Sequence, residues 1–245
     1  MTDRYDRQII IDGFGIGGQE RLKHSRVLIA GAGGLGSAIS IYLAIAGVGS
    51  LRIVDKDEVS LSNLNRQPLY QATDIGRRKA QAAEEKLRKL NPDIQVEGIS
   101  GTITQHSVFQ LVDDCDIIVD AMDNFPTRYA LNRAALKRDV PFIYGGIYGL
   151  EGAVTTIIPG KTACLKCIFP ESPRPATFPV LGAAPGIIGC LQAMEAIKYI
   201  VGIGDLLTNR LLIFDGFSMK FREVKLERYP QCPDCSPLAG SCTDF

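Results

Sequence analysis

The chain has 245 residues, of which 46% are hydrophobic and 22% charged, with 27 lysines and arginines against 27 aspartates and glutamates. This hydrophobic fraction excludes wholesale disorder, and the zero net charge excludes a strongly basic nucleic-acid binder unless the charge is concentrated on one face. No apolar run approaches the roughly 18 residues of a membrane-spanning helix, and the polar start, Met1 to Arg4, is unlike a secretory signal. We therefore expect a cytoplasmic protein that binds neither nucleic acid nor membrane.

Short apolar runs alternate with stretches of helical periodicity over the first 150 residues. We predict strands at 26–30, 50–55, 94–99, 116–121 and 140–144, and helices at 36–46, 75–90 and 126–137. The second helix places Ala80, Ala83, Leu87 and Leu90 on one face and stops before Asn91 and Pro92. Strands that alternate with helices predict an α/β fold with a mostly parallel sheet and helices on both of its faces.

The pattern changes after about residue 150. An apolar segment at 152–158 has no long helix before it, which favours an antiparallel addition to the sheet. A proline-rich loop is expected at 168–184, a helix at 185–201, and strands at 210–214 and 221–226. Because we find no internal repeat and no low-complexity linker, we predict a single domain over 1–245, with a nucleotide-binding part at about 20–150 and a modified C-terminal part at about 151–245.

A glycine-rich turn follows the first predicted strand. Gly31 to Gly36 (GAGGLG) fits the pattern GxGxxG between a strand and a helix. Glycines there let the backbone turn tightly and approach a phosphate, and the helix N-terminus supplies oriented N–H groups. Asp55, at the end of the second strand, is placed to bind a ribose hydroxyl. The pattern predicts a nucleotide site without separating NAD, FAD and ATP, and the alternative is a tight turn without a ligand.

Polar and cationic side chains follow the second predicted strand. Ser60 to Gln67 (SLSNLNRQ) is a polar loop at a strand's carboxyl end, where open α/β sheets bind ligands. Arg66 in this loop and Lys79 on the next helix favour phosphoryl or nucleotidyl transfer over hydride transfer, because developing charge on phosphate oxygens needs cations. Asp123, after the fourth strand, offers the carboxylate that Mg²⁺ prefers. The structural alternative is a solvated basic face at 77–79.

Several spaced motifs occur in one order along nearly the whole chain. They are Arg4 to Gln8 (RYDRQ), the glycine segment, Asp55, Ser62 to Gln67 (SNLNRQ), Lys79, Asp123 with Asn124, and residues 191–196 (LQAMEA). Together they resemble the ubiquitin-activating-like adenylyltransferases of the ThiF/MoeB/HesA type. Bacterial members of this family serve molybdopterin and thiamine synthesis.

The resemblance implies a Rossmann-like fold, usually in a homodimer, and an enzyme that uses ATP and Mg²⁺ to adenylate a small ubiquitin-like sulfur-carrier protein on its C-terminal Gly-Gly carboxylate. By position it implies that Asp55 holds the ribose, that the glycine loop holds the phosphates, with Gly34 closest, and that Asp123 supports Mg²⁺. The full set that it implies for the nucleotide is Gly31, Gly33, Gly34, Gly36, Asp55, Asp57, Ser62, Asn63, Arg66, Gln67, Lys79, Asp123 and Asn124.

Catalytic roles are implied for Arg7, Arg66, Lys79 and Asp123. Arg7 would be an arginine finger that reaches the ATP of the partner protomer; without the resemblance it would be taken as a surface arginine. The chemistry suits this set, because a carboxylate is already ionised near neutral pH and attacks the α-phosphate without a general base. Catalysis then needs positioning and cationic stabilisation. The two histidines, His24 and His106, lie beside none of the motifs.

Four of the seven cysteines form two CxxC pairs, Cys164 with Cys167 and Cys232 with Cys235. Four thiolates make a closed tetrahedral site for structural Zn²⁺, and the resemblance implies the same tetrad. The gap between the pairs, 168–231, is longer than in a compact zinc ribbon, so a redox dithiol and inert cysteines are the alternatives. We expect zinc to tie the C-terminal tail to the body, in the part that the resemblance assigns to carrier binding.

The remaining cysteines are Cys115, Cys190 and Cys242, with Cys190 expected in the core. Many relatives carry a cysteine in the loop before the late helix, whereas the corresponding stretch here, 174–179 (RPATFP), has none. We therefore expect adenylation without a thioester on this loop. Sulfur would come from a separate sulfurtransferase, since no rhodanese domain follows residue 245.

Other interpretations stay open. An NAD-linked oxidoreductase fits the glycine loop and Asp55, and tight NADH binding would favour it. A non-catalytic binding or scaffold protein is opposed by the intact set of Arg7, Asn63, Arg66, Lys79 and Asp123. Among adenylating enzymes, the acceptor could instead be a peptide or a tRNA-bound carboxylate.

Overall fold

One eight-stranded sheet organises the part of the chain that the computed structural model describes, residues 4–172 and 179–236. The strands lie in the order β3-β2-β1-β4-β5-β6-β7-β8, the first five parallel and the last three added antiparallel. This confirms the predicted fold class. The strand bounds are β1 (Arg26–Ala30), β2 (Ser50–Asp55), β3 (Gln95–Ser100), β4 (Ile117–Asp120), β5 (Phe142–Tyr148), β6 (Glu151–Ile157), β7 (Arg210–Asp215) and β8 (Lys220–Lys225).

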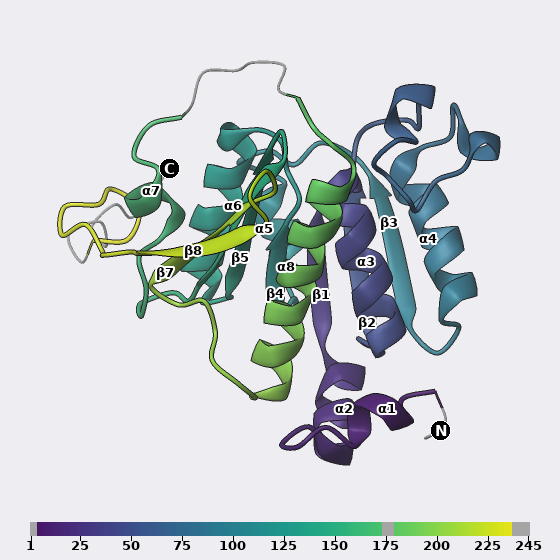
Figure 1. Cartoon of the computed structure of the whole chain (residues 1–245), viewed down its shortest axis with the longest axis horizontal. Helices are drawn as coiled ribbons and strands as arrows, with labels where there is room; N and C mark the ends of the chain where they lie inside the picture. The colour runs from purple at the N-terminus through teal and green to yellow at the C-terminus, as the bar shows by residue number, and fades with distance from the viewer. Residues whose placement is uncertain (1–3, 173–178, 237–245) are drawn as a thin grey trace.

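Helices cover both faces of the sheet (Figure 1). One apolar core takes side chains from α2 (Gly15–His24), α3 (Gly34–Ala46), α4 (Lys79–Leu90) and α8 (Ala183–Val201). The core on the other face takes them from α5 (Val108–Val112), α6 (Phe125–Arg138) and α7 (Leu165–Ile168). The remaining helical segments are α1 (Asp6–Ile9), η1 (Leu61–Asn63) and η2 (Ala72–Asp74). Among the described residues, no helix has the length and apolar character needed to cross a membrane.

Helices α3 and α8 lie side by side in front of the central strands (Figure 1). Their approach depends on Gly189, because a Cβ added there would lie 2.8 Å from the Cβ of Ala38 and 2.9 Å from the carbonyl oxygen of Leu35. The N-terminus of α8 is therefore held against the start of α3, which follows the glycine-rich turn.

Several predicted boundaries are wrong. Helix α4 begins at Lys79 rather than residue 75, because Gly76 has a φ of +85° that no right-handed helix adopts. Its apolar face includes Ala80, Ala83 and Leu87, but Leu90 is exposed. The predicted loop at 168–184 includes the end of α7 and the start of α8, and residues 173–178 of it lie outside the described part.

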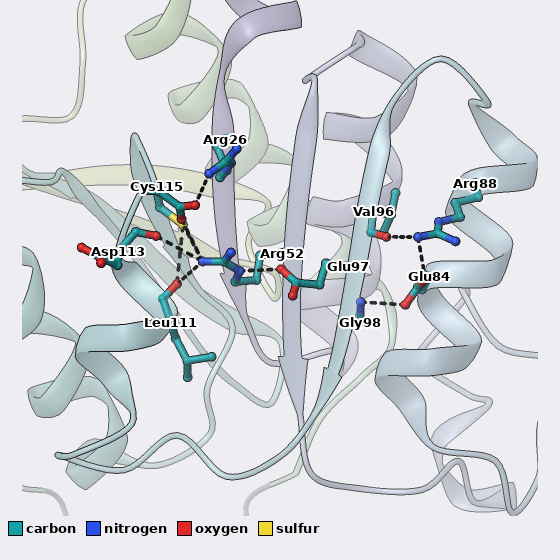
Figure 2. A network of polar contacts seen from close by, with 11 residues as sticks. Arg26, Arg52, Glu84, Arg88, Val96, Glu97, Gly98, Leu111, Asp113 and Cys115 are labelled. Carbon is teal, nitrogen blue, oxygen red and sulfur yellow. Dashed lines mark hydrogen bonds and ion pairs between the residues drawn. The ribbon is translucent and has the colours of Figure 1, made fainter.

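A network of ion pairs lies on strands β2 and β3 (Figure 2). Arg52 of β2 pairs with Glu97 of β3 and with Asp114, and it donates hydrogen bonds to the carbonyls of Leu111 and Asp113. The Sγ of Cys115 lies 3.8 Å from Nη1 of Arg52, and burial raises the pKa of this thiol to about 11. Cys115 is therefore a structural thiol, since a reactive cysteine needs a thiolate.

Cys190 and Cys242 are the other two cysteines outside the CxxC pairs. Cys190 is half-buried on α8, so the expectation of a core position is wrong for it. Cys242 lies outside the described residues.

The strand order reverses between β1 and β4, since the chain moves outward to β2 and β3 on one side and to β5 on the other. In open α/β sheets the crevice beyond the carboxyl ends of the strands at such a switch point binds ligands. The segments that follow β1, β2 and β4 meet there.

Candidate active site

The glycine turn links β1 to α3 at the switch point. Gly31 has a φ of +107°, and a Cβ on it would lie 2.6 Å from the carbonyl oxygen of Ala121, after β4. A Cβ on Gly36 would lie 2.0 Å from the Gly31 carbonyl oxygen. The turn itself requires glycine at these two positions. The close contact with Ala121 places the turn against the segment that carries Asp123.

Gly33 and Gly34 have a different environment. The nearest atom to a Cβ added on Gly33 would be 3.7 Å away, on the side chain of Gln67, so packing alone does not require a glycine there. Gly33 is the N-cap of α3 and makes no side-chain capping bond, so among the described residues no side chain caps the first N–H groups of the helix. Gly34 packs against Pro185 at the start of α8. The turn thus exposes backbone donors in a form that fits a phosphate.

Asp55 ends β2 and binds the glycine turn directly. One carboxylate oxygen accepts the N–H of Ala32 at 2.8 Å, and the other accepts the N–H of Asp57 at 2.8 Å. Burial raises the pKa of Asp55, although both hydrogen bonds and the nearby Lys79 oppose the shift. Since each carboxylate oxygen accepts more than one hydrogen bond, Asp55 keeps capacity for a ribose hydroxyl.

The polar loop after β2 is organised by its own side chains. Asn63 is buried, and its Oδ1 accepts the N–H of Ser60 in a capping box around η1. Arg66 donates to the carbonyl of Ser62 and to Asn65, and its own carbonyl oxygen lies 3.4 Å from the Cβ position of Gly34. The loop therefore sits directly against the glycine turn, with Ser62 on its exposed side.

Gln67 has an unmatched polar atom at this contact. The side chain is 4% exposed, and its Oε1 has no hydrogen-bond partner within the described residues. A buried polar atom without a partner is costly, so its presence beside the glycine turn fits a ligand that donates a hydrogen bond.

Lys79 is the first residue of α4, and its side chain is only 7% exposed. Its Nζ lies 3.4 Å from Oδ2 of Asp57, and its backbone N–H donates to the carbonyl of Asp57. A buried ammonium with one distant carboxylate partner is available to a phosphate that enters the crevice. The alternative of a solvated basic face at 77–79 holds for the exposed Arg77 and Arg78 but is wrong for Lys79, which is buried.

Asp123 and Asn124 follow β4, three and four residues after its last residue, Asp120. Asp123 is exposed and accepts a hydrogen bond from the Nδ2 of Asn124 at 3.2 Å. The Oδ1 of Asn124 accepts the N–H of Thr127 and so caps the start of α6. An exposed carboxylate at the switch point suits Mg²⁺, whereas Asn124 has a local structural task that the sequence did not suggest.

In the described part of the chain, Arg7 is the one residue of the predicted nucleotide and catalytic set that the fold leaves apart from the others. It is exposed on α1, where the neighbouring Gln8 donates to the carbonyl of Ala46 at the C-terminal end of α3. The glycine turn lies at the opposite end of this 13-residue helix, about 20 Å away at 1.5 Å per residue. Arg7 does not reach the crevice of its own chain.

Three buried residues to which the sequence analysis gave no role support the crevice, although one of them, Gln192, lies in the motif at 191–196. Tyr70 bonds the glycine turn and the start of α4, Arg128 bonds the carbonyls of Met122 and Gly145, and Gln192 bonds the carbonyls of Asp120 and Ile143. These bonds go to backbone carbonyls of other segments, and residue type does not identify such partners. The one hint in the sequence was an amide, Gln192, on an apolar helix.

Comparisons with known proteins agree with this geometry. The profile of the ThiF family matches residues 5–234. The chain belongs to the ThiF family. Like its named relatives, it is an ATP-dependent nucleotidyltransferase.

Two similar ThiF-family proteins cover nearly the same length. The chain is 45% identical to the SAMP-activating enzyme E1 of Haloferax volcanii, over 96% of this chain and 89% of that protein. It is 41% identical to the sulfur carrier protein adenylyltransferase of Thermus thermophilus, over 99% of this chain and 94% of that protein. Among solved structures, Escherichia coli MccB with ATP superposes with a TM-score of 0.85 at 26% identity, over 96% of this chain and 74% of that one.

The ThiF-family chain also carries a cluster of four thiols away from the crevice. The Sγ atoms of Cys164, Cys167, Cys232 and Cys235 all lie within 4.8 Å of one another. The separations are 3.9 Å for Cys164–Cys167, 3.6 Å for Cys164–Cys232 and 3.5 Å for Cys167–Cys235. A tetrahedral Zn²⁺ with Zn–S bonds of about 2.3 Å has S–S edges of about 3.8 Å, so the donor set fits zinc.

Surrounding groups hold the two cysteine pairs in place. The side chain of Asn132, fully buried on α6, accepts the N–H of Leu165 beside the first pair and donates to Asp234 in the second. The N–H of Tyr229 points at the Sγ of Cys167, 3.4 Å away. Such outer contacts orient metal ligands, and the cluster links α7 to the segment after β8 as predicted.

Proposed function

We propose that the chain adenylates the C-terminal Gly-Gly carboxylate of a small ubiquitin-like sulfur-carrier protein with ATP. The observation that supports this best is the crevice at the switch point, where the uncapped start of α3, the loop of Arg66 and the buried ammonium of Lys79 meet. Hydride transfer has no use for two cations beside a phosphate, whereas displacement of pyrophosphate does. The names of two relatives, a SAMP-activating enzyme and a sulfur carrier protein adenylyltransferase, support a carrier protein as the substrate.

The chain's own residues bind and orient the reactants. The backbone N–H groups of the glycine turn and Asn63, Arg66 and Lys79 hold the phosphates, while Asp55 holds the ribose. The carrier carboxylate attacks the α-phosphorus, the bond to the bridging oxygen breaks, and pyrophosphate leaves with that electron pair. No proton moves, so no general base is required. The cations stabilise charge on the pyrophosphate as it forms.

Asp123 would hold Mg²⁺, because its exposed carboxylate lies where the segments after β1 and β4 meet. When bound, the ion neutralises phosphate charge. Zinc at the four cysteines would contribute stability rather than chemistry, since all four positions are taken by protein thiolates.

Sulfur in this scheme comes from a separate sulfurtransferase. The chain matches 89% and 94% of the length of two relatives whose names mention activation or adenylylation but no sulfur transfer. It spans about half of the maize protein named adenylyltransferase and sulfurtransferase, with 40% identity. The similarity is therefore to the adenylating part of that two-function protein.

The test is ATP–pyrophosphate exchange with a purified ubiquitin-like carrier that ends in Gly-Gly. We expect exchange that depends on this carrier and is lost when the last glycine is removed. Exchange with an unrelated peptide carboxylate but not with the carrier would point to a different acceptor, and NADH binding tighter than ATP binding would overturn the assignment.

Replacing Lys79 provides the matched residue test. We expect Lys79→Met to lower kcat for exchange by about 10²- to 10³-fold, because it removes a buried cation from the phosphates. Lys89→Met, on the exposed far end of the same helix, should leave kcat within about twofold. Equal rates for the two variants would contradict the role of Lys79.

A further inference from the structure

Tyr70 lies between the two parts of the crevice that carry its positive charge. The residue follows the loop of Arg66 and Gln67, and its side chain is 5% exposed. Its hydroxyl lies 2.9 Å from the carbonyl oxygen of Ala32 in the glycine turn and 3.2 Å from the carbonyl oxygen of Lys79. One O–H group thus joins two segments that are 47 residues apart in sequence.

The peptide groups around Ala32 are fastened on both sides. The N–H of Ala32 donates to Asp55, and its carbonyl accepts the hydroxyl of Tyr70. The start of α4 is fastened in the same way, since the N–H of Lys79 donates to the carbonyl of Asp57 and its carbonyl faces Tyr70. In the described part of the chain, Tyr70 is the only side chain whose hydrogen bonds join these two segments.

The hydroxyl keeps its proton at every physiological pH. Burial raises the pKa of Tyr70 far above its usual range, and the charges of Asp55 and Asp74 raise it further. A hydroxyl that faces two carbonyl oxygens acts as a donor only, so the link does not switch with pH.

We propose that Tyr70 is a positioning residue that sets the spacing between the N–H groups of the glycine turn and the ammonium of Lys79, and so the fit of the crevice to a chain of phosphates. The inference rests on the proposed function, because it takes both groups as phosphate ligands. It extends that function to a residue that contacts neither substrate. Positioning errors of about 1 Å lower rates substantially in enzymes that act by orientation.

If Tyr70 is a positioning residue, the effect of removing its hydroxyl on ligand affinity should depend on the number of phosphates in the ligand. Adenosine has a ribose for Asp55 but no phosphates for the glycine turn or Lys79, so its affinity should not depend on the link. ATP uses both linked segments, so its affinity should fall when the link is removed. A residue needed merely for folding would affect both ligands alike.

The experiment compares Tyr70→Phe with Tyr129→Phe by calorimetry, with ATP and adenosine titrated separately and no carrier present. Tyr129 is a matched control, because it is 9% exposed and its hydroxyl donates to one carbonyl, that of Phe169 at 2.8 Å, on the opposite face of the sheet. We expect Tyr70→Phe to weaken ATP binding about tenfold and adenosine binding less than twofold, since one buried hydrogen bond is lost. Tyr129→Phe should leave the affinities for ATP and adenosine unchanged, although its Tm should fall by about as much as that of Tyr70→Phe.

Equal losses for ATP and adenosine, or equal losses in the two variants, would overturn the positioning role. Because the titration needs no carrier, a wild-type chain that binds ATP but shows no carrier-dependent exchange would reject the proposed function and still test Tyr70. A wild-type chain that binds no ATP would overturn both.

Discussion

A buried ion pair supports the segment that carries Asp123. Asp120 is fully buried at the end of β4, and one of its oxygens lies 3.0 Å from Nε of Arg128, which is 6% exposed on α6. The guanidinium also donates to the carbonyls of Met122 and Gly145 and lies over the rings of Phe125 and Tyr144. Arg128 therefore fastens the end of β4 and the middle of β5 to the helix that follows Asp123.

Removing the cation should destabilise the chain strongly. We expect Arg128→Met to lower the free energy of unfolding by about 3–5 kcal/mol, because Asp120 would be left as an unpaired buried charge. Arg138→Met on the same helix breaks only an exposed ion pair with Asp113, so its cost should stay within about 1 kcal/mol. Urea unfolding of the two variants at pH 7 measures the difference, and similar losses would contradict the assignment.

The loss of stability in Arg128→Met should also depend on pH. Burial raises the pKa of Asp120 to about 6 even with Arg128 in place. A carboxyl whose folded pKa is raised contributes most to stability when it is protonated, and this contribution is lost as the pH rises through that pKa. Without Arg128 the pKa rises further, so the difference between Arg128→Met and wild type should be larger at pH 8 than at pH 5. The opposite trend would show that the lost charge is not what destabilises the variant.

At the residue scale, the sequence could predict where side chains lie when they follow strands, while their roles stay predictions. Arg66, Lys79 and Asp123 could be placed at one edge because the carboxyl ends of parallel strands share that edge. Tyr70, Arg128 and Gln192 could not, because they act on backbone carbonyls whose positions exist only in the folded chain.

At the scale of elements, the buried strands of the parallel half were predictable because each is a short apolar run. Helix α2 was missed because three of its ten residues are glycines, which disfavour helices in isolation. It forms because its surface packs closely; a Cβ on Gly18 would lie 2.8 Å from Val201 of α8. Tertiary packing overrides local preference there, whereas the late start of α4 follows from the local backbone conformation of Gly76.

The two cysteine pairs are the elements that fasten the C-terminal segment. Cys164, Cys232 and Cys235 are buried, yet β8, which leads to the second pair, is exposed along its whole length. Little apolar burial therefore holds this strand, and a metal ion bound by the four thiols would supply the missing restraint.

Loss of one thiolate should release zinc and loosen this segment. We expect the wild-type chain to contain about one zinc ion and Cys232→Ser to contain none, since a structural site needs four ligands. Proteolysis after β8 should become faster, while ATP affinity stays within about twofold because the nucleotide loops follow β1, β2 and β4. Atomic absorption and limited proteolysis measure the effects, with Cys190→Ser, outside the cluster, as the control. Full zinc content in Cys232→Ser would exclude this centre.

At the scale of the whole molecule, the position of Arg7 bears on whether the active site needs a second copy of the chain. The residue lies at the C-terminal end of α3, while the crevice lies at its N-terminal end, and Figure 1 shows α1 and α2 beyond the amino end of β1. If Arg7 acts in catalysis, it acts on a second copy of the chain. The predicted homodimer and the predicted arginine finger are therefore one hypothesis.

Mixing two inactive variants tests that hypothesis. Arg7→Ala and Lys79→Met should each be nearly inactive in exchange, because every site then lacks one of its three proposed cations, Arg7, Arg66 and Lys79. After subunits are exchanged in equal amounts, half of the dimers should be mixed, and each mixed dimer has one site with both residues intact. Exchange should therefore recover to about one quarter of the wild-type rate, as expected for a two-fold symmetric dimer. Mixing Lys79→Met with a Lys79→Met, Arg7→Ala double variant controls for recovery by association alone. No recovery in the first mixture, or a chain that is monomeric by gel filtration at the assay concentration, would remove Arg7 from the site.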